Sequence, residues 1–112
     1  LNKSASIKTV EKMKFEFIFL EKAKSELLET WIWYEERQEG LGERFKEKVF
    51  ECINNIEQNP YRYPERKKNY REGLVDIFPY LIIYRVLKRR KLVLIVSVFH
   101  TKRNYKLKYK RK

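Results

Sequence analysis

The chain is poor in the residue types that build disulfides, metal centres and phosphate-binding loops. Its 112 residues include one cysteine, one histidine, three glycines and three prolines. A single cysteine cannot form an internal disulfide, and one histidine with one cysteine gives no zinc pattern. Three glycines provide no glycine-rich phosphate loop. We therefore predict no metal and no cofactor, and a reducing cytoplasm as the cellular compartment.

Long hydrophobic runs are also missing. The longest apolar stretches are too short to cross a bilayer, and the first residues lack a basic segment followed by a long apolar region. Hydrophobic residues nevertheless make up 43% of the chain and recur at regular spacing, which favours a packed core over disorder. We predict one soluble domain without a membrane contact.

Acidic residues are scarce in the second half of the chain. Residues 1–60 hold 10 Lys or Arg and 12 Asp or Glu, whereas residues 61–112 hold 17 and 3. The formal net charge of +12 is therefore concentrated in one half. Such asymmetry favours a polyanion or an acidic protein as partner, although a merely solvated basic surface has the same composition.

Apolar periodicity predicts one strand followed by two helices. Phe15, Phe17 and Phe19 alternate with other residues, as in a strand with one buried face. Helical spacing extends from residue 21 to about 38 and resumes after Gly42 until Asn59-Pro60 ends it. The connection between the helices is short, so we expect antiparallel neighbours.

Strand signals follow at about 74–78, 80–87 and 92–99. Their connections are too short for parallel crossovers, which predicts an antiparallel meander. The predicted fold is α+β, in the order β-α-α-β-β-β, with a small antiparallel sheet packed against an antiparallel two-helix hairpin. We interpret residues 1–12 as an N-terminal arm or a non-native remnant, 13–104 as the folded domain and 105–112 as a basic C-terminal tail.

A series of short segments resembles the RelE/ParE toxins in order and approximate spacing. The segments are WYEE (33–36), GLGERF (40–45), NPYRYP (59–64), Arg71, FPYLIIYRV (78–86) and VFHTKR (98–103). The resemblance covers roughly residues 13–104, and it rests on the combined series. It implies the toxin of a bacterial type II toxin-antitoxin pair, of the plasmid stabilisation kind. Its partner would be an acidic antitoxin encoded nearby.

The resemblance implies one of two activities. RelE-like members cut messenger RNA in the ribosomal A site, and ParE-like members inhibit DNA gyrase. In RelE-like nucleases a critical arginine follows the tyrosine that aligns with Tyr80, and here that position is Leu81. We therefore favour gyrase inhibition slightly over a ribosome-dependent, metal-independent endoribonuclease, so whether the protein is an enzyme stays open. A third hypothesis is a non-toxic basic binding module on the same fold.

Three residues are candidates for catalysis if the protein is a nuclease. Cleavage without a metal needs a proton-transfer group and cations beside the phosphate. His100 is the candidate acid or base, because histidine exchanges protons near neutrality, but its phase in the strand also fits a side chain that caps the core. Arg71 and Arg103 match positions where the family usually has arginine. An arginine that ties a loop to the sheet is an equal alternative for both.

Other residues are predicted to bind a target or a partner. The candidates for target or phosphate binding are Arg85, Lys102, Tyr105 and Lys106. In the tail, tyrosines alternate with cations, which suits stacking on bases, although a solubilising tail has the same composition. The candidates for antitoxin binding are Arg66, Lys67, Lys68 and Trp33. Trp33 could also contact a second copy in a homodimer.

Overall fold

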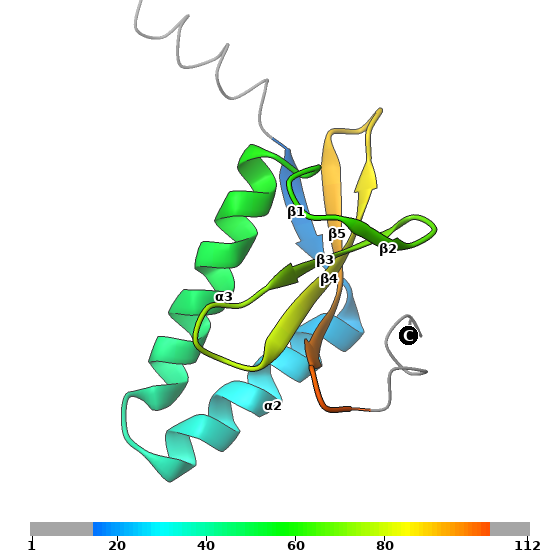
Figure 1. The fold of residues 1–112 in the computed structure, drawn as a ribbon. Coiled ribbons are helices and arrows are strands. Elements are labelled where there is room, and N and C mark those ends of the chain that lie inside the picture. The colour runs from blue at the N-terminus through cyan, green and yellow to red at the C-terminus, as the bar shows by residue number, and fades with distance from the viewer. Residues whose placement is uncertain (1–14, 104–112) are drawn as a thin grey trace, which may run out of the picture.

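Two helices form a hairpin against a five-stranded sheet in the computed structural model (Figure 1). The structure describes residues 15–103, so the predicted arm, 1–12, and tail, 105–112, lie outside it. The α+β class and the helical hairpin are confirmed. The elements are β1 (Glu16–Phe19), α2 (Glu21–Arg37), α3 (Leu41–Gln58), β2 (Glu65–Lys67), β3 (Tyr70–Leu74), β4 (Tyr80–Leu87) and β5 (Leu92–His100).

The sheet is mixed, with the strand order β1-β5-β4-β3-β2. Strands β3 to β5 form an antiparallel meander, as predicted for three strands, and β2 extends it at the edge. The first strand differs from the expected antiparallel arrangement, because β1 pairs parallel with β5, from Glu16 beside Leu92 to Phe19 beside Ile95. Parallel neighbours need a long crossover connection, and the helical hairpin lies within the crossover that starts at β1.

The strand predicted at 74–78 is wrong in position. The strand lies at 70–74, and residues 65–67, for which no strand was predicted, form the short edge strand β2. Residues 75–79 turn instead, with Ile77 at a φ of +74° and Pro79 without an N–H to donate. The N–H of Val75 donates to the carbonyl of Tyr80 (2.9 Å) and closes this turn.

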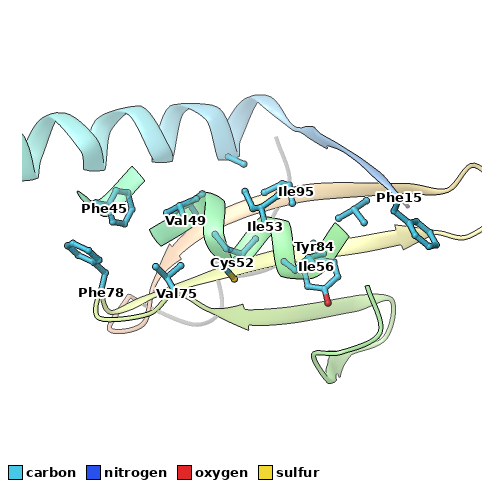
Figure 2. Close-up of a cluster of buried hydrophobic side chains, with 14 residues drawn as sticks. Phe15, Phe45, Val49, Cys52, Ile53, Ile56, Val75, Phe78, Tyr84 and Ile95 are labelled. Carbon is cyan, nitrogen blue, oxygen red and sulfur yellow. The ribbon is translucent and has the colours of Figure 1, made fainter. Parts of the chain in front are cut away.

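The core lies between α3 and the sheet. The predicted apolar stripe of α3 is buried, and Figure 2 shows it facing Val75, Phe78, Tyr84 and Ile95 of the sheet side. Helix α2 buries only Ala23 completely. The stripe of α3 consists of Phe45, Val49, Cys52, Ile53 and Ile56. No helix within 15–103 is long and apolar enough to span a membrane.

The connection between the helices is fixed by Glu35. Its carboxylate accepts the backbone N–H groups of Gly40 (2.8 Å) and Gly42 (2.9 Å). These bonds, the one from Gly40 foremost, and the N–H of Glu43 lower the pKa of the Glu35 carboxyl, although desolvation opposes them. Glu35 thus satisfies N–H groups at the start of α3, where a helix leaves its first donors without partners.

Candidate functional site

His100 ends β5 and lies opposite Tyr80, the first residue of β4. The two rings meet edge to face, with centroids 4.9 Å apart. The backbone N–H of Lys102 donates to Nδ1 of His100 (3.0 Å). Because an N–H can only donate, Nδ1 is unprotonated and the neutral ring carries its proton on Nε2. His100 therefore presents a hydrogen-bond donor.

An open pocket of about 310 Å³ adjoins this histidine. Its volume lies at the lower end of the range for ligand pockets, enough for one side chain or base. No Lys or Arg of the described chain lines it, and Glu29 gives it a carboxylate. The lining residues are Glu29, Thr30, Trp33, Tyr34, Tyr80 and His100.

Two tyrosines of the pocket lining pack against aromatic rings of the core. Tyr34 lies 5.0 Å from Phe78, and Tyr80 lies 5.1 Å from Phe45, measured between ring centroids. Burial, with a smaller contribution from Tyr80, raises the pKa of Tyr34. Tyr34 therefore keeps its proton at neutral pH and offers the pocket a hydroxyl group rather than a base.

Trp33 stands exposed at the pocket. Its side chain is 49% exposed, and its ring meets Tyr34 edge to face at 5.1 Å. The guanidinium of Arg37 stacks 3.5 Å above the Trp33 ring and also donates to the Trp33 carbonyl (3.1 Å). Trp31 takes the other side of α2, where its Nε1–H donates to Glu43 of α3 (3.0 Å). Arg37 and Tyr34 thus hold the Trp33 ring in place, with part of the ring exposed to solvent.

Arg103 is held by Glu26 of α2. Its guanidinium pairs with the Glu26 carboxylate at 3.2 Å and lies 5.6 Å from the Phe99 ring. The same carboxylate, 12% exposed, accepts the Ser97 hydroxyl (2.7 Å) and the Val98 N–H (2.9 Å). β1 pairs with β5 only as far as Ile95, and beyond that point Glu26 of α2 bonds to the edge of β5. Arg103 pairs with the same carboxylate and so helps to hold α2 against β5.

Sequence reasoning missed Glu26. Its position was informative, because Ala23, Leu27 and Tyr34 define the inward face of α2 and Glu26 falls on that face rather than on the solvated one. A carboxylate on an apolar helix face needs polar partners. Here the partners are the backbone and side chains at the end of β5.

Arg71 ties a loop to the sheet, the alternative that its type allowed. It donates to the Tyr63 carbonyl (2.7 Å), pairs with Glu65 (3.8 Å) and lies 5.1 Å from the Tyr61 ring. In the sheet it lies opposite Tyr84, four positions along β4 from Tyr80. Four strand residues span about 13 Å. Arg71 therefore lies about 13 Å along the sheet from the level of His100.

Arg85 lies on the other face of the sheet from Tyr84, because neighbouring strand residues point to opposite faces. Its guanidinium lies 5.8 Å from the Tyr70 ring, and its Nε is buried without a hydrogen-bond partner in the described chain. This back face holds the small cluster of Ile83, Val96 and Phe99. Arg71 and Arg85 thus point to opposite faces of the sheet, and none of the three candidate arginines lines the His100 pocket.

A second hollow, of about 330 Å³, runs between the helices. It is mainly apolar, and Leu28 and Phe50 in it are 55% and 38% exposed. Two cations, Lys24 and Lys46, complete its lining. Sequence reasoning missed this groove because α2 and α3 each show only part of it. The apolar lining is Phe19, Leu27, Leu28, Trp31 and Phe50.

The comparison with known families decides the identity. A family model described as ParE toxin of type II toxin-antitoxin system, parDE, matches residues 17–105. The chain belongs to the ParE toxin family. The fold is also similar to a solved structure described as the chromosomal ParDE TA system from P. aeruginosa, with a TM-score of 0.68 at 15% identity, over 80% of this chain and 98% of that one. No curated protein matches.

Membership of the ParE family implies a cognate antitoxin, and the residues predicted to bind it are not together. Arg66, Lys67 and Lys68 are exposed on the β2–β3 hairpin, whereas Trp33 lies on α2 beside the pocket. Lys102 is exposed beside His100. Tyr105 and Lys106 lie outside the described residues.

Two further positions matter for the chemistry of this ParE-family chain. Leu81 packs against the back-face cluster, so the position that carries arginine in RelE-like nucleases contributes an apolar contact here. Cys52 lies in the core, and burial raises the pKa of its thiol to about 11. Among residues 15–103, no three His, Cys, Asp or Glu side chains gather as metal ligands would.

Proposed function

We propose that this ParE-family toxin arrests growth by binding DNA gyrase rather than by cutting RNA. The observation that carries the proposal is that no Lys or Arg of residues 15–103 lines the pocket beside His100. A metal-independent nuclease must place a cation within hydrogen-bond reach of the phosphate that its acid or base serves. The pocket beside His100 offers aromatic rings, hydroxyl groups and a carboxylate instead.

Neither neighbouring arginine is placed to supply that cation. Arg103 is already engaged by the Glu26 carboxylate, which also holds the end of β5. Arg71 lies about 13 Å further along the sheet. Lys102 is nearest in sequence, and its backbone N–H already orients the histidine. The arrangement favours recognition over phosphate chemistry.

The pocket and Trp33 suit recognition of a protein. Exposed Trp, Tyr and Arg side chains dominate the binding energy of protein interfaces, and Trp33, Tyr80 and Arg37 gather here. We propose that a side chain of the target enters the pocket, stacks on Trp33 and accepts the Nε2–H of His100.

The groove between the helices suits the antitoxin. Its apolar lining with lysines at Lys24 and Lys46 fits an amphipathic segment that carries acidic residues beside its apolar ones. We propose that the antitoxin occupies this groove. It would hold the toxin without needing the His100 pocket.

The test induces the gene in bacteria and follows translation, messenger integrity and plasmid supercoiling together. Gyrase inhibition predicts loss of supercoiling while messages stay intact, and purified toxin should inhibit purified gyrase. Rapid collapse of translation with cleaved messages and normal supercoiling would reject it in favour of the nuclease. Normal growth without any antitoxin would reject both toxin activities in favour of a non-toxic binding module.

Two variants connect the activity to the site. Trp33→Ala and His100→Ala should each reduce gyrase inhibition at least 10-fold, with folding checked by circular dichroism. His100→Gln can present a side-chain N–H donor and should retain part of the activity. Glu36→Gln, on the same helix as Trp33, is the control. Full inhibition by both alanine variants would remove the pocket from the proposal.

A further inference from the structure

The two β-hairpins turn at the same end of the sheet. β3 is antiparallel to β4, with Arg71 opposite Tyr84, so the start of β3 lies beside the end of β4. The β2–β3 turn (68–69) and the β4–β5 turn (88–91) therefore both lie away from the α2–α3 connection, and Figure 1 shows the β4–β5 turn pointing upward and the β2–β3 turn pointing to the right. Two strand spacings separate them in the hydrogen-bonding direction, which is about 10 Å.

Positive charge is concentrated in and around these two turns. Among residues 15–103, the side chains of Arg66, Lys68 and residues 88–90 have no ion-pair partner. The strands of this end carry the carboxylates of Glu16, Glu65 and Glu72, and Glu65 is engaged by Arg71 and by the Asn69 N–H (3.1 Å). The exposed cations are Arg66, Lys67, Lys68, Lys88, Arg89, Arg90 and Lys91.

Aromatic contacts connect the β4–β5 turn to the loop after α3. The Lys91 ammonium lies 5.4 Å from the Phe15 ring, and Phe15 meets Tyr61 edge to face at 6.4 Å. Arg71 covers the Tyr61 ring, which is still 46% exposed. Arg62 follows it in the chain and is exposed. These contacts hold the β4–β5 turn against the loop after α3, and they leave the partly exposed Tyr61 among the positive charges.

The chemistry of this end fits a nucleic acid better than a protein. Protein interfaces have an apolar core in which lysine is depleted, whereas phosphate contacts need Lys and Arg without apolar area. Neither turn exposes a large hydrophobic residue. In the described chain such residues are Ile18, Leu28, Ile32, Trp33, Phe50, Tyr61, Leu74 and Ile77.

We propose that the two hairpin turns bind the phosphate backbone of double-stranded DNA. Measured across the strands, the turns are about 10 Å apart, which is on the scale of the groove widths of B-DNA, about 6 and 12 Å, so the two turns can contact the two strands that border a groove. Arg66, Lys67 and Lys68 then serve DNA rather than the antitoxin. This inference goes beyond gyrase binding and does not rest on it, because the contact lies at the opposite end of the sheet from His100.

The test measures binding of the full chain to a fluorescein-labelled 20-base-pair DNA duplex by anisotropy across a range of salt concentrations. Affinity should fall steeply with salt, with a slope of about −0.9 for each phosphate contact. One triple variant is Arg66→Gln, Lys67→Gln, Lys68→Gln. The other is Lys88→Gln, Arg89→Gln, Arg90→Gln, which keeps Lys91 because its φ is +53°.

Each triple variant should lose about 10-fold in affinity and reduce the salt slope by about 2 to 3. A control with the same change in net charge, Lys22→Gln, Arg44→Gln, Lys48→Gln on the helices, should lose less than 2-fold. Equal loss in the control, or no loss in either hairpin variant, would overturn the proposal. Circular dichroism identifies a variant that fails to fold, and the other hairpin variant then decides.

Competitors distinguish the sources of negative charge. Unlabelled DNA duplex should compete best. Equal competition by duplex RNA or by the single DNA strand would overturn a site for duplex DNA in favour of phosphate in general. Equal competition by polyglutamate of matched charge would assign the surface to an acidic protein. Gyrase inhibition in vitro is scored separately, so either proposal can fail alone.

Discussion

The backbone carbonyl of Trp31 occupies the space that a side chain at Gly42 would need, 2.5 Å from the position of its Cβ. The first turn of α3 is thereby pressed against α2. This contact explains why the short connection of the helical hairpin contains a glycine at 42, where no unusual φ requires one. Gly40 is different, with a φ of +88° and no atom within 4 Å of its Cβ position.

Gly42→Ala should destabilise the fold by about 1 to 3 kcal/mol, because a backbone atom cannot give way as a flexible side chain does. Gly40→Ala should cost about 1 to 2 kcal/mol for a different reason, its left-handed φ. Asn tolerates a left-handed φ, so Gly40→Asn should be more stable than Gly40→Ala. Gly42→Asn should be no more stable than Gly42→Ala. Urea unfolding measures all four variants. Equal tolerance of Asn at both positions would contradict the packing explanation.

The free energy of unfolding should fall in acid, because Glu35 loses its charge there. Its pKa is lowered in the folded state, chiefly by the Gly40 N–H, so its contribution is present above the ordinary glutamate pKa and is lost as pH falls through the lowered one. The advantage of the parent over Glu35→Gln should therefore shrink below about pH 4.3. Thermal unfolding between pH 7 and pH 2.5 checks this, with Glu36→Gln as control. A constant difference between parent and variant would contradict it.

Removing Glu26 should destabilise the protein more than removing Arg103. Glu26→Ala leaves the Val98 N–H and the Ser97 hydroxyl without their acceptor, at about 1 to 3 kcal/mol for each buried group. Arg103→Ala removes one half-exposed cation and should cost about 1 kcal/mol or less. Denaturant titration of both variants and their double variant measures the coupling. A larger cost for Arg103→Ala would show that the ion pair outweighs the strand edge.

Ile77→Gly should stabilise the fold. Ile77 has a φ of +74°, which is unfavourable for a β-branched residue, and its side chain is 62% exposed, so little burial is lost. Relief of about 1 to 2 kcal/mol exceeds the added chain entropy of glycine, about 0.5 to 1 kcal/mol. Ile77→Val keeps the strain and serves as control. A lower urea midpoint for Ile77→Gly than for the parent would contradict the expectation.

Leu28→Glu should weaken antitoxin binding at least 10-fold if the antitoxin occupies the groove between the helices. The new carboxylate would stand in an apolar lining and would also repel acidic residues of the antitoxin. As the control, Leu74→Glu changes a leucine of similar exposure, 62% against 55%, that lies away from the groove. Titration calorimetry with the cognate antitoxin measures both. Equal effects of the two variants would place the antitoxin elsewhere.

The helices could be predicted closely, because the apolar stripe of α3 and its end at Asn59-Pro60 are local signals. The parallel pairing of β1 with β5 could not, since it joins strands separated by most of the chain. The candidate arginines had the right residue types, but their partners decide their roles. Glu26 holds Arg103, and the Tyr63 carbonyl holds Arg71. Such partners come together only in the folded chain.

The neighbourhood of β1 and β5 has a consequence for how the toxin is made. β1 begins at Glu16 and finds its partner only at Leu92, so most of the sequence must leave the ribosome before the edge of the sheet can close. Contacts between distant residues slow folding. A nascent chain that stops before residue 92 lacks the strand that presents His100 and the carbonyl of Ile95 that fixes Leu20 at the start of α2. Synthesis of the last strand thus sets the earliest moment at which the protein can reach its native shape.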